Sequence, residues 1–271
     1  TSEKLERLFW SHYTMEQYDD RLYQKLLRYN PSGILLWLYR DINRRMLNMK
    51  IVLEVFNALT DVEYVADFHA LSLIVHEVDE QHYSDEWAKV CLRLYCNGLL
   101  KREYDSFPMC LRRYFFRKPF ELLEIIKNNK YRINFRYFKL PEEAFLNRSM
   151  LFEWVKTIAN IGERGKRFVG EVLGKAPMAS DGIFPHEAVR DVLERADDVE
   201  LTRAVASGKF TAVSFRSVCD GRAEYKKALA YREQARRIEI DYPQSAEILR
   251  ILAKYYEEMS RTDRVYSELG L

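Results

Sequence analysis

Glycine and proline are scarce in this sequence, whose 271 residues include 10 glycines and 7 prolines. An all-β protein needs turn residues at short, regular intervals, and this chain has them at only a few positions. Apolar residues make up 48% and charged residues 31% of the chain, which is typical of folded rather than disordered proteins. The scarcity of turn residues therefore predicts a mostly α protein.

Paired cysteines and long apolar runs are also missing. The four cysteines, Cys91, Cys96, Cys110 and Cys219, form no C-x-x-C motif, and we interpret them as reduced residues of a cytoplasmic protein. No apolar run approaches the roughly 20 residues that span a bilayer, and the charged start from Thr1 to Trp10 does not resemble a signal peptide. Because the sequence begins without methionine, we expect an excerpt of a longer protein.

Helical periodicity fills the first 130 residues. Proline-containing breaks such as Asn30-Pro31 separate the periodic segments. The predicted helices cover residues 14–29, 34–42, 51–59, 64–78 and 84–100, a short segment after Pro108, and residues 119–126. Seven helices with short connections predict an antiparallel helical bundle or a repeat-like solenoid array over residues 1–130. We find no fixed repeat period, and a degenerate repeat stays open.

The pattern changes at Lys130–Leu140, where polar and apolar residues alternate for a few positions. We interpret residues 131–140 as an extended linker or a short strand, and as a domain boundary. Residues 141–271 are then predicted to form a smaller helical domain. Two long helices, separated at Tyr242-Pro243, are predicted to end it as a hairpin, with the charged last helix capping the array. Glycines at residues 162–182 and 208–221 are predicted to end helices and to let the backbone turn.

Histidines and acidic residues do not form a recognised catalytic or metal-binding motif. His76-Glu77 begins like H-E-x-x-H, but Glu80 occupies the position of the second histidine. A metal-dependent helical hydrolase with ligands at His69, His76 and Asp79 stays open as an alternative. We favour an ordinary helix end here, and we assign no catalytic residues, no metal ligands and no cofactor.

His186 and Glu187 follow Pro185 in the first turn of a predicted helix. Glu187 complements the positive end of the helix dipole, and His186 is predicted to cap the helix or to pack locally. Gly170–Gly174 does not match the phosphate-binding pattern G-x-x-x-x-G-K-[ST], so nucleotide hydrolysis is not predicted.

Positive charge is concentrated in residues 101–140, although the whole chain has a net charge of only +2. This segment holds eleven Lys or Arg residues and four Asp or Glu residues, and aromatic residues alternate with the bases. Such an array can neutralise phosphates and stack on unpaired bases. The same pattern arises when the rings pack inward and the basic side chains extend to water. The candidate binding residues are Arg112, Arg113, Arg117, Lys118, Arg132 and Arg136.

Three segments in the last third of the chain carry a resemblance. Asp181–Glu194 (DGIFPHEAVRDVLE), Tyr225–Arg232 and Tyr242–Leu249 resemble a carboxy-terminal helical region of large multidomain bacterial proteins, some of which carry NTPase or effector modules upstream. Lys209–Val213 departs from the glycine-rich turn typical of that region. The resemblance implies a terminal helical module and assigns no activity to it.

These features together predict a non-catalytic helical interaction or scaffold module of a larger bacterial protein. Its expected partner is another protein or another domain of the parent protein, and no membrane contact is expected. The first alternative is a nucleic-acid-binding accessory domain that uses residues 101–140. The second alternative is the metal-dependent helical hydrolase.

Overall fold

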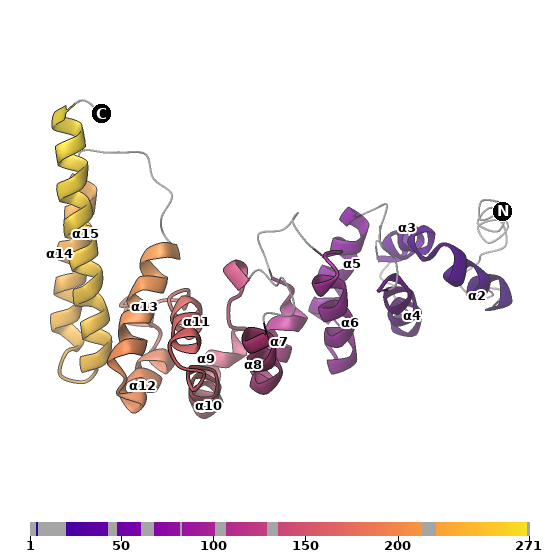
Figure 1. Cartoon of the computed structure of the whole chain (residues 1–271), viewed down its shortest axis with the longest axis horizontal. Coiled ribbons are helices and arrows are strands. Elements are labelled where there is room, and N and C mark those ends of the chain that lie inside the picture. Colours follow the sequence, from indigo (N-terminus) through magenta and orange to yellow (C-terminus); the bar gives the residue numbers. More distant parts are fainter. Residues whose placement is uncertain are drawn as a thin grey trace. The chain divides into compact units, whose positions relative to one another are not determined.

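All regular secondary structure in the described part of the chain is helical, so the prediction of a mostly α protein is confirmed. Figure 1 shows the helices along the chain of the computed structural model. The structure describes Lys4 and residues 20–42, 48–60, 68–81, 83–100, 107–128, 135–212 and 221–269.

The chain divides into two compact units. One comprises Thr1–Tyr114 with Tyr131–Tyr137, and the other comprises Phe115–Lys130 with Phe138–Leu271. The division lies within helix α7 (Met109–Arg117), whereas the sequence suggested a boundary at residues 131–140.

Where it can be described, the interval that suggested a strand or an extended linker contains one short helical turn and no strand. Phe135–Tyr137 forms a single 3-10 turn, η1, and residues 138–140 have no regular structure, while residues 131–134 lie outside the described part. The ring of Phe135 stacks against that of Phe107 in the first unit. Phe138 and Leu140 are buried in the second unit. The apolar residues of the alternating pattern therefore pack in the units themselves: Phe135 in the first, and Phe138 and Leu140 in the second.

Capping side chains mark where two helices of the first unit begin. Asn48 accepts a hydrogen bond from the Lys50 amide at 3.1 Å, and Ser84 accepts one from the Trp87 amide at 3.1 Å. Both contacts satisfy amides that have no partner within the helix, and the cap at Ser84 agrees with the predicted start of a helix at residue 84. The helices of this unit that precede α7 are α2 (Asp20–Tyr29), α3 (Pro31–Ile42), α4 (Met49–Leu59), α5 (Phe68–Gln81) and α6 (Asp85–Cys96).

Asp79 connects three helices in the core of the first unit, where it is only 3% exposed. Its Oδ1 accepts a hydrogen bond from Trp87 Nε1 at 2.9 Å, and its Oδ2 accepts one from the Cys110 amide at 3.0 Å. Cys91 and Cys110 lie in the same core, and burial raises the pKa of both thiols. These two cysteines are free and buried. Asp79 therefore holds α5, α6 and α7 together through paired hydrogen bonds.

The second unit is built from the helices that follow α7. α10 packs on α8, α11 and α12, while α13 packs on α11 and α15. These helices are α8 (Pro119–Asn128), α9 (Glu143–Leu146), α10 (Arg148–Ala159), α11 (Glu163–Leu173), α12 (Glu187–Ala196), α13 (Val199–Ala212), α14 (Arg222–Ile238) and α15 (Pro243–Leu269).

Gly170 and Gly208 lie inside helices, in contrast to the prediction that the glycines of these two segments end helices and form turns. Gly170 is in α11 and Gly208 is in α13, and these two helices approach each other closely. A Cβ added to Gly208 would lie 2.3 Å from the Gly170 carbonyl oxygen, and one added to Gly170 would lie 2.4 Å from Ala204. The glycines are therefore needed for close contact between helix backbones.

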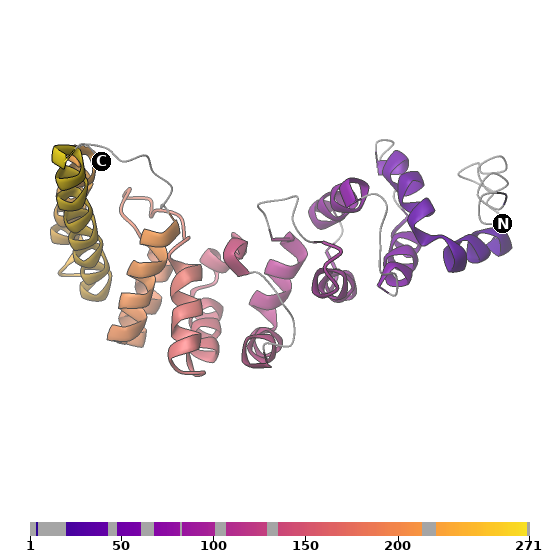
Figure 2. The ribbon, with the colours of Figure 1, turned by 45° about the horizontal axis from the view of Figure 1, so that its top comes forward.

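α14 and α15 form the predicted antiparallel hairpin, and Figure 2 shows it beside α13. Ser260 Oγ donates to the Gly221 carbonyl at 2.7 Å, which joins the start of α14 to the later part of α15. Glu194 of α12 accepts hydrogen bonds from the Gln244 and Ser245 amides, each at 3.0 Å, at the start of α15.

The inner helix of the hairpin is α15, because it packs on α12 and α13 as well as on α14. α14 packs chiefly on α15 and is the outer helix. The apolar stripe of α15 is broad enough to contact helices on two sides. The expectation that the charged last helix caps an array stays a prediction.

Candidate functional site

The six predicted binding residues belong to different parts of the structure. Arg112 and Arg113 are in the first unit, while Arg117 and Lys118 are in the second. Arg132 lies outside the described residues, and only the backbone of Arg136 is described, in η1.

Arg112 and Arg113 are partly buried near Asp79 in the first unit. Arg113 Nη1 donates to the Asp79 carbonyl at 3.5 Å, and its guanidinium lies 5.9 Å from the centre of the Tyr83 ring. Burial lowers the pKa of the Arg112 guanidinium, and the charge of Asp79 opposes that change. The rest of the cluster is nearer the surface. Arg117 pairs with Glu143 at 3.7 Å, and Lys118 is exposed.

The aromatic rings between these bases face the interior. Tyr114 and Phe115 are fully buried, and Phe116 is 2% exposed. Rings in this position contribute to the core and cannot stack on a ligand at the surface. The alternation of bases and rings in α7 is therefore the amphipathic pattern of a packed helix.

Asp79, one of the residues considered for a metal site, does not face an open position. Both carboxylate oxygens of Asp79 accept hydrogen bonds in the core, His76 is exposed, and the side chain of His69 is outside the described part. Among the described residues, no group of three or more His, Cys, Asp or Glu could hold a metal ion. None of the described helices combines the length and the apolar character needed to cross a membrane.

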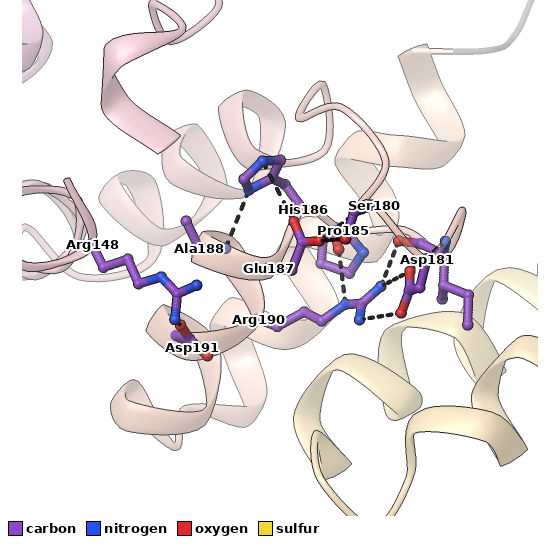
Figure 3. Close-up of polar contacts among 10 residues, drawn as sticks. Arg148, Ser180, Asp181, Pro185, His186, Glu187, Ala188, Arg190 and Asp191 are labelled. Atoms are coloured by element: carbon purple, nitrogen blue, oxygen red, sulfur yellow. Dashed lines mark hydrogen bonds and ion pairs between the residues drawn. The ribbon is translucent and has the colours of Figure 1, made fainter. Parts of the chain in front are cut away.

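Arg190 organises the loop that precedes α12, as Figure 3 shows. Its side chain is 3% exposed, and Nη1 and Nη2 donate to the two carboxylate oxygens of Asp181 at 2.8 and 2.9 Å. Nε donates to the Pro185 carbonyl at 2.9 Å, and Nη2 donates to the Ile183 carbonyl at 2.6 Å. The hydrogen bonds from Arg190 hold the pKa of Asp181 below its usual value. The guanidinium is thus committed to holding the loop.

His186 and Glu187 fix the start of α12 (Figure 3). His186 Nδ1 accepts a hydrogen bond from the Ala188 amide at 3.2 Å, which confirms the prediction of a local cap. Glu187 accepts hydrogen bonds from the amide and the hydroxyl of Ser180, and these lower the pKa of Glu187 to about 2. A carboxylate with so low a pKa is a weak base. This His-Glu pair is therefore suited to holding the loop rather than to moving a proton.

The exposed side chains of α14 form the surface that best fits a binding role. Of its charged residues, six exposed ones are basic and one is acidic. Tyr225 and Leu229 are 44% and 45% exposed and lie one helical turn apart among these bases. We call this set the α14 outer face. It consists of Arg222, Tyr225, Lys226, Lys227, Leu229, Arg232, Glu233, Arg236 and Arg237.

Comparisons with protein-family models, with curated proteins and with solved structures found no match. The similarity of Asp181–Glu194 and the hairpin segments to a terminal region of bacterial proteins stays a prediction. In this chain, the first of those segments contains Arg190 and the loop that it holds, and the other two segments belong to the α14–α15 hairpin.

Sequence reasoning missed the α14 outer face because the charges of the hairpin nearly balance along the chain. Two signals were present, the basic pairs Lys226-Lys227 and Arg236-Arg237. Such pairs also occur on the solvent-exposed face of an ordinary helix, so they indicate a binding surface only once α14 is known to be the outer helix.

Proposed function

We propose that the chain is a non-catalytic helical interaction module that contacts its partner through the α14 outer face. The observation that carries this proposal is the exposure of Tyr225 and Leu229 on the outer helix of the hairpin. Single exposed apolar residues are common on protein surfaces. Tyr225 and the arginines near it are of the residue types enriched at interface centres, and Leu229 adds apolar surface one turn away.

Three polar side chains of the second unit support the same proposal. Arg190 holds a loop, Glu187 fixes that loop to α12, and Glu194 caps α15. Each of these groups stabilises the helical array that presents α14. In this proposal, the partner is a macromolecule that contacts the exposed ring and the basic side chains of α14.

Site-specific photo-crosslinking in cells tests the proposal. A photo-reactive amino acid replaces Leu229 on α14 or, as a matched control, Glu258, which is exposed on α15. We expect a crosslinked adduct from position 229 and little or none from position 258. The adduct should be lost when Arg222→Glu and Lys226→Glu are added, because these changes reverse the charge around the contact.

Two results would count against the proposal: equal adduct yields at both positions, or no adduct at position 229. The double charge variant must keep the helical circular dichroism signal of the parent chain, so that loss of the adduct reports loss of contact. Digestion of the adduct with nuclease shows whether the bound macromolecule is a nucleic acid, because nuclease leaves a protein–protein adduct intact.

A further inference from the structure

In the α14–α15 hairpin, two acidic side chains, one on α14 and one on α15, lie in less exposed positions than the basic side chains of α14. Glu224 is 3% exposed and faces the interior, and Glu257 of α15 is 15% exposed beside Arg232. The acidic residue on the α14 outer face is Glu233, which pairs with Arg236 at 3.5 Å. A hairpin whose sequence is nearly neutral thereby presents an outer helix that is strongly basic.

Lysine and arginine side chains on one face of a helix are typical of a surface that binds a polyanion. Arg222, Lys226, Arg232 and Arg236 follow one another at intervals of four, six and four residues along α14, which places them within about one third of the helix circumference. Positive side chains in such a row can each neutralise a phosphate along one extended strand. Charge complementarity therefore favours a nucleic-acid backbone as the occupant.

An exposed aromatic ring lies among these basic side chains. The Arg264 guanidinium lies 5.6 Å from the centre of the Tyr225 ring, and both side chains are exposed. Tyrosine rings and arginine planes are the groups on which unpaired bases stack, whereas the bases of a duplex are already stacked on each other. Leu229, one turn along the helix, adds apolar surface beside the ring.

From these observations we infer that the α14 outer face binds single-stranded nucleic acid, with its arginines and lysines on the phosphates and Tyr225 under an unpaired base. This inference rests on the proposed function and names the partner class for the same surface. It places nucleic-acid binding on the terminal hairpin and not on residues 101–140.

Fluorescence anisotropy with the full chain tests the inference. The probes are labelled single-stranded RNA and DNA of about 20 nucleotides, which exceeds the size of a typical single-strand binding site, and the matching duplexes. We expect micromolar binding of the single strands that weakens between about 50 mM and about 200 mM salt. Binding of the duplexes should be weaker, because their bases are not open for stacking.

Charge reversal locates the site. The triple variant Arg222→Glu, Lys226→Glu, Arg236→Glu should bind the single strands at least about tenfold more weakly. The slope of log binding constant against log salt concentration should become shallower by about 0.7 for each lost phosphate contact. The control Lys139→Glu, Lys156→Glu, Arg203→Glu changes the net charge by the same amount at exposed positions outside the hairpin. It should keep most of the affinity. Equal losses in both variants, or no binding by the parent chain at low salt, would overturn the inference.

The variant Tyr225→Ala tests the stacking contact. It should weaken single-strand binding several-fold and leave duplex binding unchanged, whereas equal effects on both would overturn the stacking role. A crosslink at position 229 that protease degrades and nuclease does not would retain the proposed function and refute this inference. An adduct sensitive to nuclease would support both.

Discussion

Arg190 shows how a buried charge is accommodated in this protein. Its guanidinium makes four hydrogen bonds within one loop, two of them to the carboxylate of Asp181. Removing a partner from such a pair leaves a buried charge without compensation, which is costly. The sequence could suggest a cap at His186, because this residue follows a proline at a helix start. The role of Arg190 could not be foreseen, because burial of an arginine depends on how the loop folds over it.

The carboxylate of Glu187 should make acid stability depend on pH. Its pKa is about 2 in the folded chain against an ordinary value of 4.5, because it accepts hydrogen bonds from Ser180. The ionised form therefore stabilises the fold fully above about pH 4.5, and this contribution is lost as the pH falls towards 2. The difference in unfolding free energy between the parent chain and Glu187→Gln should be largest near neutral pH and should shrink through this range.

Urea unfolding at several pH values measures this difference. Glu153→Gln, which changes an exposed carboxylate on α10, is the matched control and should show little change at any pH. A difference for Glu187→Gln that stays constant from neutral pH down to pH 2 would show that the hydrogen bonds to Ser180 do not depend on ionisation.

At the scale of helices, periodicity and capping residues located most elements. Ser84 and Pro119 marked helix starts correctly, and Tyr242-Pro243 marked the turn of the hairpin. α11 was missed because Gly165 and Gly170 lower helix propensity and looked like turn residues. The actual role of Gly170 depends on α13, more than thirty residues away in the sequence, so no local pattern could show it.

Gly208→Ala tests the close contact between α11 and α13. In an isolated helix this change would add up to about 1 kcal/mol of stability. Here the new Cβ would lie 2.3 Å from the Gly170 carbonyl oxygen, so we expect a net loss of about 1–3 kcal/mol from overpacking. The neighbouring change Ser207→Ala, at an exposed position of the same helix, should be neutral or slightly stabilising. Thermal unfolding distinguishes the two, and a stabilised Gly208→Ala chain would refute the close contact.

At the scale of the whole molecule, the placement of charge could be read from the sequence only in part. The sequence identified residues 101–140 as the basic segment, with a strong local excess of Lys and Arg. In the structure, Arg113 is tied to the core and the rings of Tyr114 and Phe115 are buried. The basic surface with an exposed ring is instead on α14, because the fold turns Glu224 inward and leaves α14 on the outside of the hairpin.

Crosslinking at successive positions of the hairpin determines whether α14 contacts a partner with one face. The photo-reactive residue is placed at positions 225, 229, 232 and 236 of α14 and at positions 254, 258 and 261 of α15, all of which are exposed. We expect high adduct yields at the α14 positions and low yields at positions 254 and 258, with an intermediate yield at position 261. Similar yields at all seven positions, or the highest yields on α15, would show that α14 is not the contact surface.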